Sequence, residues 1–366
     1  MSTLDPRRIY IARTLRGITK FTLSQQLGVT VRTINKYEHS GAPSYTAPAL
    51  AKALEFPNNF FTRADPPLTP PSTKISWRCG RRATRDQQES ALAAGTLGIE
   101  IDQWVMQRFR LPELDLPTIG AESPQAAAMT VRHVWGLGIH PLPNLVQLCE
   151  SKGIGVYTLP PRADIAEAFS LWHNAKPYVF LGRGPAPEIV RFNLAHELGH
   201  LLMHTNEQTI TATQEREANA FATELLMPAD SLFDYLGRNP NITTLLTYRN
   251  CYQVPALPLA HSLHSIGGLT EYAYRQTCIE LSQRGFRTAE PNGMTNYEMS
   301  AVFRQILSPT RGATVSARKI AADLCIPTAE VHALTFGAQL RPAQNTEVRA
   351  YLQPPSGGVA PHLYRV

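Results

Sequence analysis

The feature that most constrains this chain is a pair of histidines four residues apart, His196 and His200. Apolar residues recur around the pair at helical spacing and predict a helix: Ile189, Phe192, Leu194, Ala195, Leu198, Leu201 and Leu202. Positions i and i+4 of a helix share one face, so both imidazole rings can bind one zinc ion. Glu197 between them can act as general base on a water at that ion. The competing interpretation is two exposed histidines on an ordinary helix.

A catalytic zinc site needs a third protein ligand and one open position. The next predicted helix, from about Gln214 to Met227, offers Glu215 and Glu217. His204 continues the histidine series and is another candidate, although we expect it to end the first helix and face water. Gly199 lowers helix propensity, which predicts the close approach of a neighbouring element at that position.

The segments RFNLAHELGHLLMH (191–204) and EREANAFATELLMP (215–228) resemble the ImmA/IrrE-type metallopeptidases, gluzincin-like enzymes that cleave repressor proteins. In that family the two histidines and a glutamate of the following helix bind zinc. The resemblance implies that His196, His200 and Glu217 are the ligands and that Glu197 is catalytic. Glu217 is preferred because it stands directly before Ala218, as in the family's E-A-N-x-F-A block, and Glu215 is the alternative.

Composition indicates a globular protein, with 43% hydrophobic and 17% charged residues. The sequence has no run of 18 apolar residues, so no membrane span is predicted. The first residues lack the apolar core of a signal peptide. The five cysteines are scattered without a CxxC pair, so we expect reduced thiols and a cytoplasmic protein.

Positive charge is concentrated at the start of the chain. Residues 1–63 hold nine Lys or Arg against three Asp or Glu, an excess equal to the formal charge of the whole protein, +6. The remaining residues are balanced, so this segment alone is predicted to have an anionic partner.

The same segment predicts helices over residues 6–17, 20–28, 31–39 and 48–54, with Thr19 and Thr30 as N-caps. The short turn headed by Gly28 gives helix-turn-helix spacing, and the segment resembles XRE/Cro-type DNA-binding domains. The resemblance implies an operator in double-stranded DNA, read by the third helix. The implied DNA-binding residues are Lys20, Arg32, Thr33, Asn35 and Lys36, where Lys20 replaces the family's usual Gln and favours a phosphate contact. The alternative is a helical docking module with a solvated basic face.

The predicted fold is mainly α with a small β-sheet, in three structured parts and one linker. Residues 1–63 form the helical domain, 64–74 a Pro-rich linker, 75–240 the α+β peptidase domain, and 241–366 a helical accessory region. Period-two patterns predict strands over 153–159, 167–172 and 178–181, in a small antiparallel sheet whose edge could hold substrate as an added strand. His173, at a strand end, is a candidate oxyanion donor or a surface histidine.

Two later stretches, 245–266 and 315–334, also have helix–turn–helix spacing, but neither is basic, so we interpret them as scaffold or partner surface. The tail from Arg341 is predicted to be irregular. The combined prediction is a DNA-binding regulator whose zinc metalloendopeptidase domain cuts a repressor-like protein, with a homodimer as a candidate assembly. The alternative is a non-catalytic transcription factor whose peptidase-like domain senses a signal or binds a partner.

Overall fold

The computed structural model describes residues 3–63, 66, 75–78, 84–120, 123–163, 167–204, 210–307 and 315–337. The predicted linker, apart from Pro66, and the predicted irregular tail lie outside the described residues.

The N-terminal unit, residues 3–63, contains four α-helices and two short 3-10 helices: α1 Pro6–Leu15, α2 Lys20–Leu27, α3 Val31–Ser40, η1 Ser44–Thr46, α4 Ala47–Leu54 and η2 Asn58–Thr62. The predicted caps are confirmed, because the Thr19 and Thr30 hydroxyls accept hydrogen bonds from the amides of Thr22 and Thr33. Gly28 ends α2 in the left-handed conformation, with φ of 65°, which glycine adopts without steric cost.

The centre of the molecule is a four-stranded sheet in the order β1-β3-β4-β2. Its strands are β1 Ile75–Arg78, β2 Gly155–Thr158, β3 Ala168–His173 and β4 Lys176–Leu181. The β1–β3 and β3–β4 pairs are antiparallel, but β2 pairs with β4 in parallel, so the expectation of a purely antiparallel sheet was wrong. All four β2 residues are buried, which suits a parallel strand covered on both faces.

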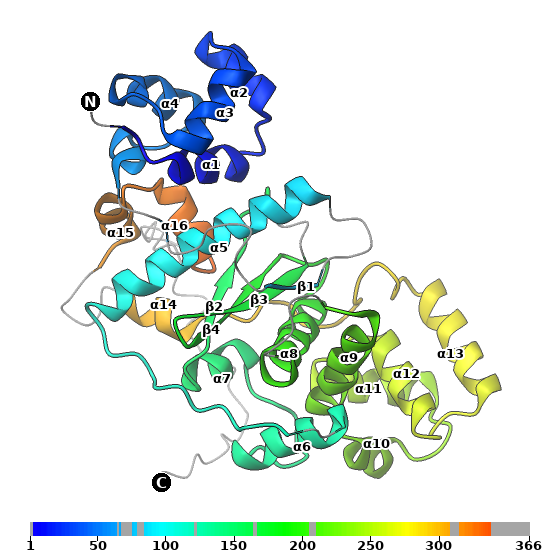
Figure 1. Ribbon diagram of the computed structural model, residues 1–366. Helices are drawn as coiled ribbons and strands as arrows, with labels where there is room; N and C mark the ends of the chain where they lie inside the picture. The colour runs from blue at the N-terminus through cyan, green and yellow to red at the C-terminus, as the bar shows by residue number, and fades with distance from the viewer. Residues whose placement is uncertain are drawn as a thin grey trace, which may run out of the picture.

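Helices cover both faces of this sheet (Figure 1). One face carries the long α5 Arg85–Met106 and the other carries α8 Pro187–Met203, against which α9 Ala212–Leu226 packs. The remaining helices beside α8 and α9 are α6 Pro124–Val134 and α7 Leu145–Ser151. Gly98 lets α5 approach the sheet closely, since a Cβ there would lie 2.7 Å from the ring of Phe180.

Alternation along β3 divides its side chains between these two layers. The ring of Phe169 faces α5, where a Cβ on Gly95 would lie 2.9 Å from it. Ser170, the next residue, contacts Glu197 of α8, and Trp172 donates its indole N–H to the Leu201 carbonyl of α8. The strand therefore presents Ser170 to the helix that carries both histidines.

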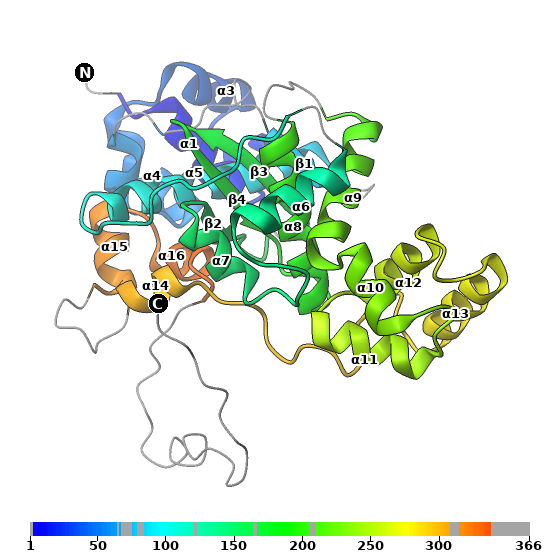
Figure 2. The same ribbon diagram turned by 90° about the horizontal axis from the view of Figure 1, so that it is seen from below.

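The region after residue 240 divides into two groups. Helices α11 Ile242–Tyr252, α12 Ala256–Ser265 and α13 Glu271–Gln283 project from the central body together with α10 Ala229–Leu236 (Figure 2). Helices α14 Ala301–Ile306, α15 Ala317–Leu324 and α16 Thr328–Leu334 return to α5, α7 and β2. Within the described ranges, no helix has both the length and the apolar character that crossing a membrane requires.

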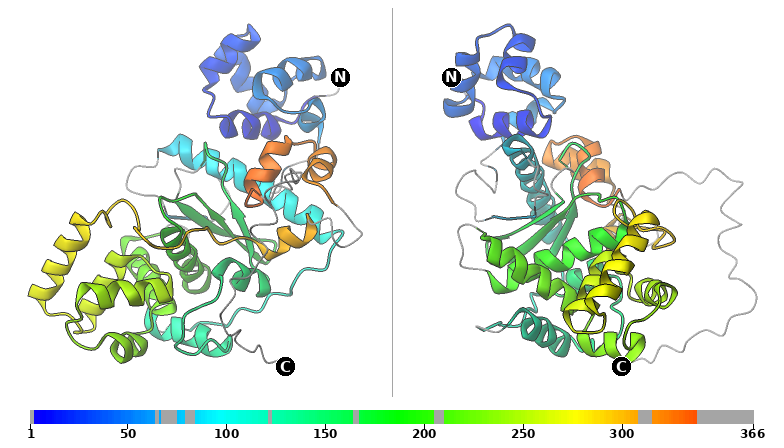
Figure 3. Two further views of the ribbon diagram at one scale, coloured as in Figure 1. Left: turned by 180° about the vertical axis from the view of Figure 1, so that it is seen from behind. Right: turned by 90° about the vertical axis from the view of Figure 1, so that its right-hand side faces the viewer.

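The N-terminal unit sits on α5 through α1, next to α15 and α16 (Figure 3). Arg8 of α1 and Arg63 both pair with Glu100 of α5, whose side chain is 3% exposed. Arg16 pairs with Glu330 of α16 at 2.6 Å. Three of the nine basic residues in this unit therefore hold it against the body of the protein.

Candidate metal centre

Helices α8 and α9 pack closely where Gly199 faces Phe221. A Cβ on Gly199 would lie 3.0 Å from the Phe221 ring, so a larger residue would push the helices apart. The close approach predicted at Gly199 is therefore confirmed. Glu215, Ala218, Asn219 and Ala222 recur at i, i+3, i+4 and i+7 of α9, and both alanines are fully buried. This stripe sets Glu215 and Asn219 opposite the histidines of α8.

Three metal-binding groups converge between these helices: His196, His200 and Glu215. The Nε2 atoms of the two histidines lie 3.0 Å apart. The carboxylate of Glu215 lies 3.5 Å from Nε2 of His196 and 3.4 Å from Nε2 of His200. Both histidines are buried, whereas the Glu215 side chain is 36% exposed, so the cluster is reached from the Glu215 side.

The spacing of these atoms fits a tetrahedral zinc ion. Bonds of about 2.1 Å in that geometry put neighbouring ligand atoms roughly 3.4 Å apart. Two imidazoles and one carboxylate also form a donor set that zinc commonly takes in catalytic sites. Three protein donors leave a fourth position open, as such a site requires.

Asn219 fixes the ring orientation of His196. Its amide nitrogen donates to the Glu215 backbone carbonyl, 2.8 Å away, so its oxygen faces Nδ1 of His196 at 3.1 Å. Nδ1 therefore carries the proton, which leaves the lone pair of Nε2 directed into the cluster.

The charge state of Glu215 suits a cation site. Burial by itself would raise the pKa of this carboxyl, but when no metal is bound, hydrogen bonds and positive charge from protonated His196 and His200 hold it well below its usual range. Glu215 is therefore a carboxylate at neutral pH, ready to bind a cation without losing a proton first.

The family resemblance implied that Glu217 is the third zinc ligand, but in the structure its side chain contacts His204. Its carboxylate lies 3.0 Å from Nε2 of His204, and Nδ1 of His204 lies 2.9 Å from Nδ1 of His200. Residues two apart on a helix point in different directions, so Glu215 and Glu217 cannot share one target. His204 ends α8 as predicted, but its side chain is only 6% exposed and does not face water as expected.

Glu197 is fully buried, and Ser170 holds its carboxylate. The Ser170 hydroxyl donates to Oε2 of Glu197 at 2.6 Å. A hydrogen bond to one carboxylate oxygen fixes the rotation of the group and steadies the ionised form. Ser170 was missed by the sequence analysis because a lone serine in a strand carries no motif.

His173 does not share the face of Ser170. Three positions along β3 reverse the direction of a side chain, so His173 faces away from the α8 layer. Its ring lies 3.0 Å from the amide of Asn174, and burial lowers its pKa. This position favours the surface-histidine interpretation over oxyanion stabilisation.

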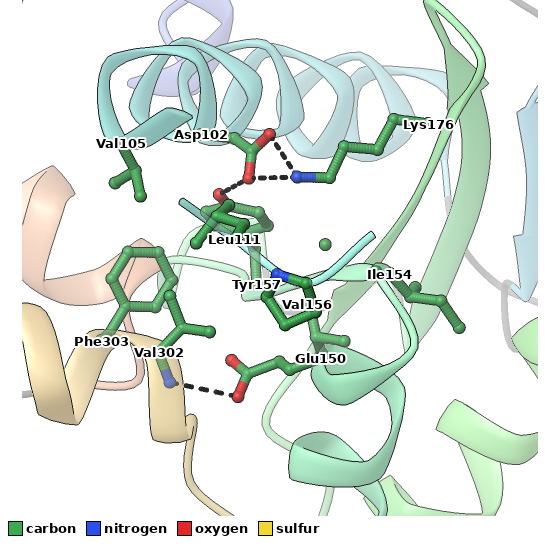
Figure 4. A pocket seen from close by; sticks show the side chains of 13 residues that line it. Asp102, Val105, Leu111, Glu150, Ile154, Val156, Tyr157, Lys176, Val302 and Phe303 are labelled. Atoms are coloured by element: carbon green, nitrogen blue, oxygen red, sulfur yellow. Dashed lines mark hydrogen bonds and ion pairs between the residues drawn. The ribbon is translucent and has the colours of Figure 1, made fainter. Parts of the chain in front are cut away.

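A separate pocket on the α5 side of the sheet has its polar groups paired internally (Figure 4). Asp102 accepts hydrogen bonds from Tyr157, Tyr178 and Lys176 at 2.8 to 2.9 Å. The cavity holds about 20 Å³, room for about one water molecule. Its contacts tie α5 to the sheet and contribute nothing to the histidine cluster.

The five predicted DNA-binding residues lie together on α2 and α3. Arg32, Asn35 and Lys36 are exposed, and Thr33 is half-buried. Lys20 donates to the Asn35 side-chain oxygen at 2.8 Å and pairs with Glu38 at 3.3 Å. The main contacts of α3 are with α1 and α2, on the side away from its polar face.

Two histidines and a carboxylate on packed helices beside a small sheet form the arrangement of a metallopeptidase-like domain. Residues 149–264 match the model of a peptidase family described as the IrrE N-terminal-like domain. The match covers less than half of the chain and includes α11 and α12, which lie beyond the predicted end of the peptidase domain. A comparison with curated proteins found no match.

Proposed function

We propose that the cluster of His196, His200 and Glu215 is a zinc centre and that the domain around it hydrolyses a peptide bond in a repressor-like protein. The observation that carries the proposal is the convergence of three donors on one point, beside a buried glutamate held by Ser170. Glu215 replaces Glu217 as the third ligand because its carboxylate lies near both histidines.

Zinc bound there would polarise the scissile carbonyl and lower the pKa of a water molecule. Glu197 would accept a proton from the attacking water, whose oxygen bonds to the carbonyl carbon. The carbon–nitrogen bond then breaks, and Glu197 returns the proton to the departing amine. Ser170 would keep the carboxylate of Glu197 turned toward the water during both transfers.

The geometry of the sheet suggests where a peptide lies. The β2 edge is covered, because Thr158 donates to the Ala333 carbonyl and accepts from the Phe336 amide. β1 forms the opposite edge and contacts α8. A substrate strand added to the sheet would therefore pair with β1.

We also propose that the N-terminal unit binds duplex DNA through α3. The exposed basic and amide side chains on that helix support the proposal. Helix α3 packs mainly against α1 and α2, whereas the contact with α5 is made mainly by α1. The docking of α1 on α5 would hold the peptidase centre at a fixed position relative to a bound operator. A regulator bound beside that operator would meet the centre at a raised effective concentration.

The test is the Glu197→Gln variant, studied in cells through both reporter transcription and cleavage of the regulator. Glutamine keeps the shape of the side chain but cannot take the proton, so cleavage should stop while DNA binding and zinc content persist. Equal transcription and no cleaved regulator in either strain would favour the alternative of a non-catalytic transcription factor.

A further inference from the structure

The pair formed by His204 and Glu217 lies just outside the proposed zinc ligands and has no role in the reaction described above. His204 contacts the proposed ligand His200 through their Nδ1 atoms, and Glu217 contacts His204 on its other side. The His204 side chain is 6% exposed, so solvent does not replace its hydrogen bonds. The buried His204 imidazole therefore lies between the His200 imidazole and the Glu217 carboxylate, a specific arrangement of polar groups that needs an explanation.

The hydrogen bonds among His200, His204 and Glu217 allow one consistent placement of protons when His200 uses Nε2 as a ligand atom. Nδ1 of His200 then carries a proton and donates it to Nδ1 of His204, 2.9 Å away. Nδ1 of His204 is thus an acceptor, and the proton of a neutral His204 lies on Nε2. That N–H donates to the Glu217 carboxylate at 3.0 Å.

We infer that His204 and Glu217 act as an outer-shell pair that orients His200 and strengthens zinc binding without contacting the metal. This inference rests on the proposed zinc centre. The pair does for His200 what Asn219 does for His196, since each supplies an acceptor to the ligand's Nδ1. A ligand held in the correct tautomer and rotation binds its metal more tightly.

The decisive variants are His204→Asn and His204→Leu in the full-length protein, with zinc affinity measured by chelator competition. The asparagine side-chain oxygen can occupy the place of Nδ1 and keep the acceptor, whereas leucine fills the space and removes it. We expect His204→Leu to weaken zinc binding by roughly tenfold to a hundredfold, with one zinc still bound at saturation. His204→Asn should lose much less.

A space-filling role for His204 predicts the opposite order, because an apolar site tolerates leucine better than an unsatisfied amide. The matched control is His133→Ala on α6, an exposed histidine that is not part of the cluster. Glu217→Ala should weaken zinc binding in the same direction as His204→Leu, because it removes the acceptor that fixes the tautomer of His204.

A second measurement reads the protons directly. In zinc-loaded protein with ¹⁵N-labelled histidine, we expect His204 as the Nε2–H tautomer, and we expect Glu217→Ala to alter that signal. Wild-type affinity in His204→Leu would overturn the inference, and loss of stoichiometric zinc would make His204 a ligand. The proposed zinc centre itself is tested separately. It fails if the double variant His196→Ala, His200→Ala keeps one zinc, or if the wild type binds no zinc. Either result would also remove the inference about His204 and Glu217.

Discussion

The candidate metal centre and the polar face of α3 are built in opposite ways. At the candidate metal centre, two buried histidines of α8 and the half-buried Glu215 of α9 converge on one point, and hydrogen-bond partners fix the directions of both histidines and of Glu197. On α3, the side chains are exposed and spread along one helix. Convergent buried groups restrict the possible chemistry, whereas an exposed basic face is compatible with several partners.

The arginines of the N-terminal unit make this contrast concrete. The charge of residues 1–63 pointed to an anionic partner, yet Arg8, Arg16 and Arg63 pair with carboxylates of the protein itself. Arg13 pairs with Glu38 inside the unit. Part of the charge asymmetry therefore serves docking and packing, so the sequence overstated the charge that is free to meet an anionic partner.

The largest expected effect separates Glu215 from Glu217 at the candidate metal centre. Glu215→Ala removes a proposed ligand and should reduce zinc affinity by more than about a hundredfold, beyond the range of outer-shell changes. Glu217→Ala should stay within that range and keep one zinc per chain. Zinc titration of both variants by chelator competition makes the comparison. Full zinc affinity in Glu215→Ala with loss in Glu217→Ala would restore the ligand set that the family resemblance implied.

The next effect concerns the contact between the two regions. Glu100→Gln leaves Arg8 and Arg63 without their shared carboxylate in a buried site. Removing one partner of a buried ion pair costs about 3–5 kcal/mol of stability. Chemical denaturation of the full-length protein measures this cost.

The matched control for this substitution is Glu113→Gln, which breaks an exposed pair with Arg110 and should cost less than about 0.5 kcal/mol. Equal stability of the two variants would show that the N-terminal unit is not held through Glu100.

A smaller effect is expected on the face of α3. Arg32→Ala or Asn35→Ala should reduce discrimination between specific and non-specific DNA by about 1–3 kcal/mol. Lys20→Ala should weaken binding to all sequences and lower its salt dependence. Binding titrations at several salt concentrations separate these outcomes.

Lys52→Ala on α4 is the exposed control for the α3 substitutions. If Lys52→Ala matches Arg32→Ala in every titration, the DNA contact is not on α3.

The sequence predicted local features well because their causes are local. Thr19 and Thr30 cap their helices, and the His196–His200 spacing fixes both rings on one face whatever surrounds them. The preference for Glu217 over Glu215 came from a motif comparison and did not use the stripe that Glu215 forms with Ala218 and Ala222. That stripe was present in the sequence, but a motif comparison does not measure the direction of a side chain.

Other features depend on contacts between distant segments and left no signal. The parallel pairing of β2 with β4 depends on which strand reaches the middle of the sheet. Ser170 lies 27 residues from Glu197 in the sequence, and the two side chains meet only because β3 packs against α8. The docking of Arg8 on Glu100 is equally invisible, since an arginine in a basic segment is ordinarily interpreted as surface charge.

The smallest expected effect compares two buried ionic clusters that anchor the two regions. The N-terminal anchor has two arginines around Glu100, whereas the α8 anchor has one arginine, Arg249, between Glu188 and Glu290. In the second cluster burial raises the pKa of Glu290 to about 7, the charge of Glu188 adds to the effect, and Arg249 only partly opposes it. Arginine does not titrate near neutral pH, so the excess carboxylate makes this anchor pH-sensitive.

The sign of that sensitivity follows from proton binding. Between about pH 4.5 and 7 the folded protein holds a proton on Glu290 that the unfolded chain has released, so stability falls as pH rises through this window. Glu290→Gln keeps a neutral group at the site and should flatten the fall. Glu150 and Glu224 also have raised pKa values from burial, but they are common to both proteins, so the difference between the two melting curves isolates Glu290. Thermal unfolding from pH 5 to 8 gives the comparison, and parallel curves for wild type and Glu290→Gln would mean that Glu290 is ionised throughout.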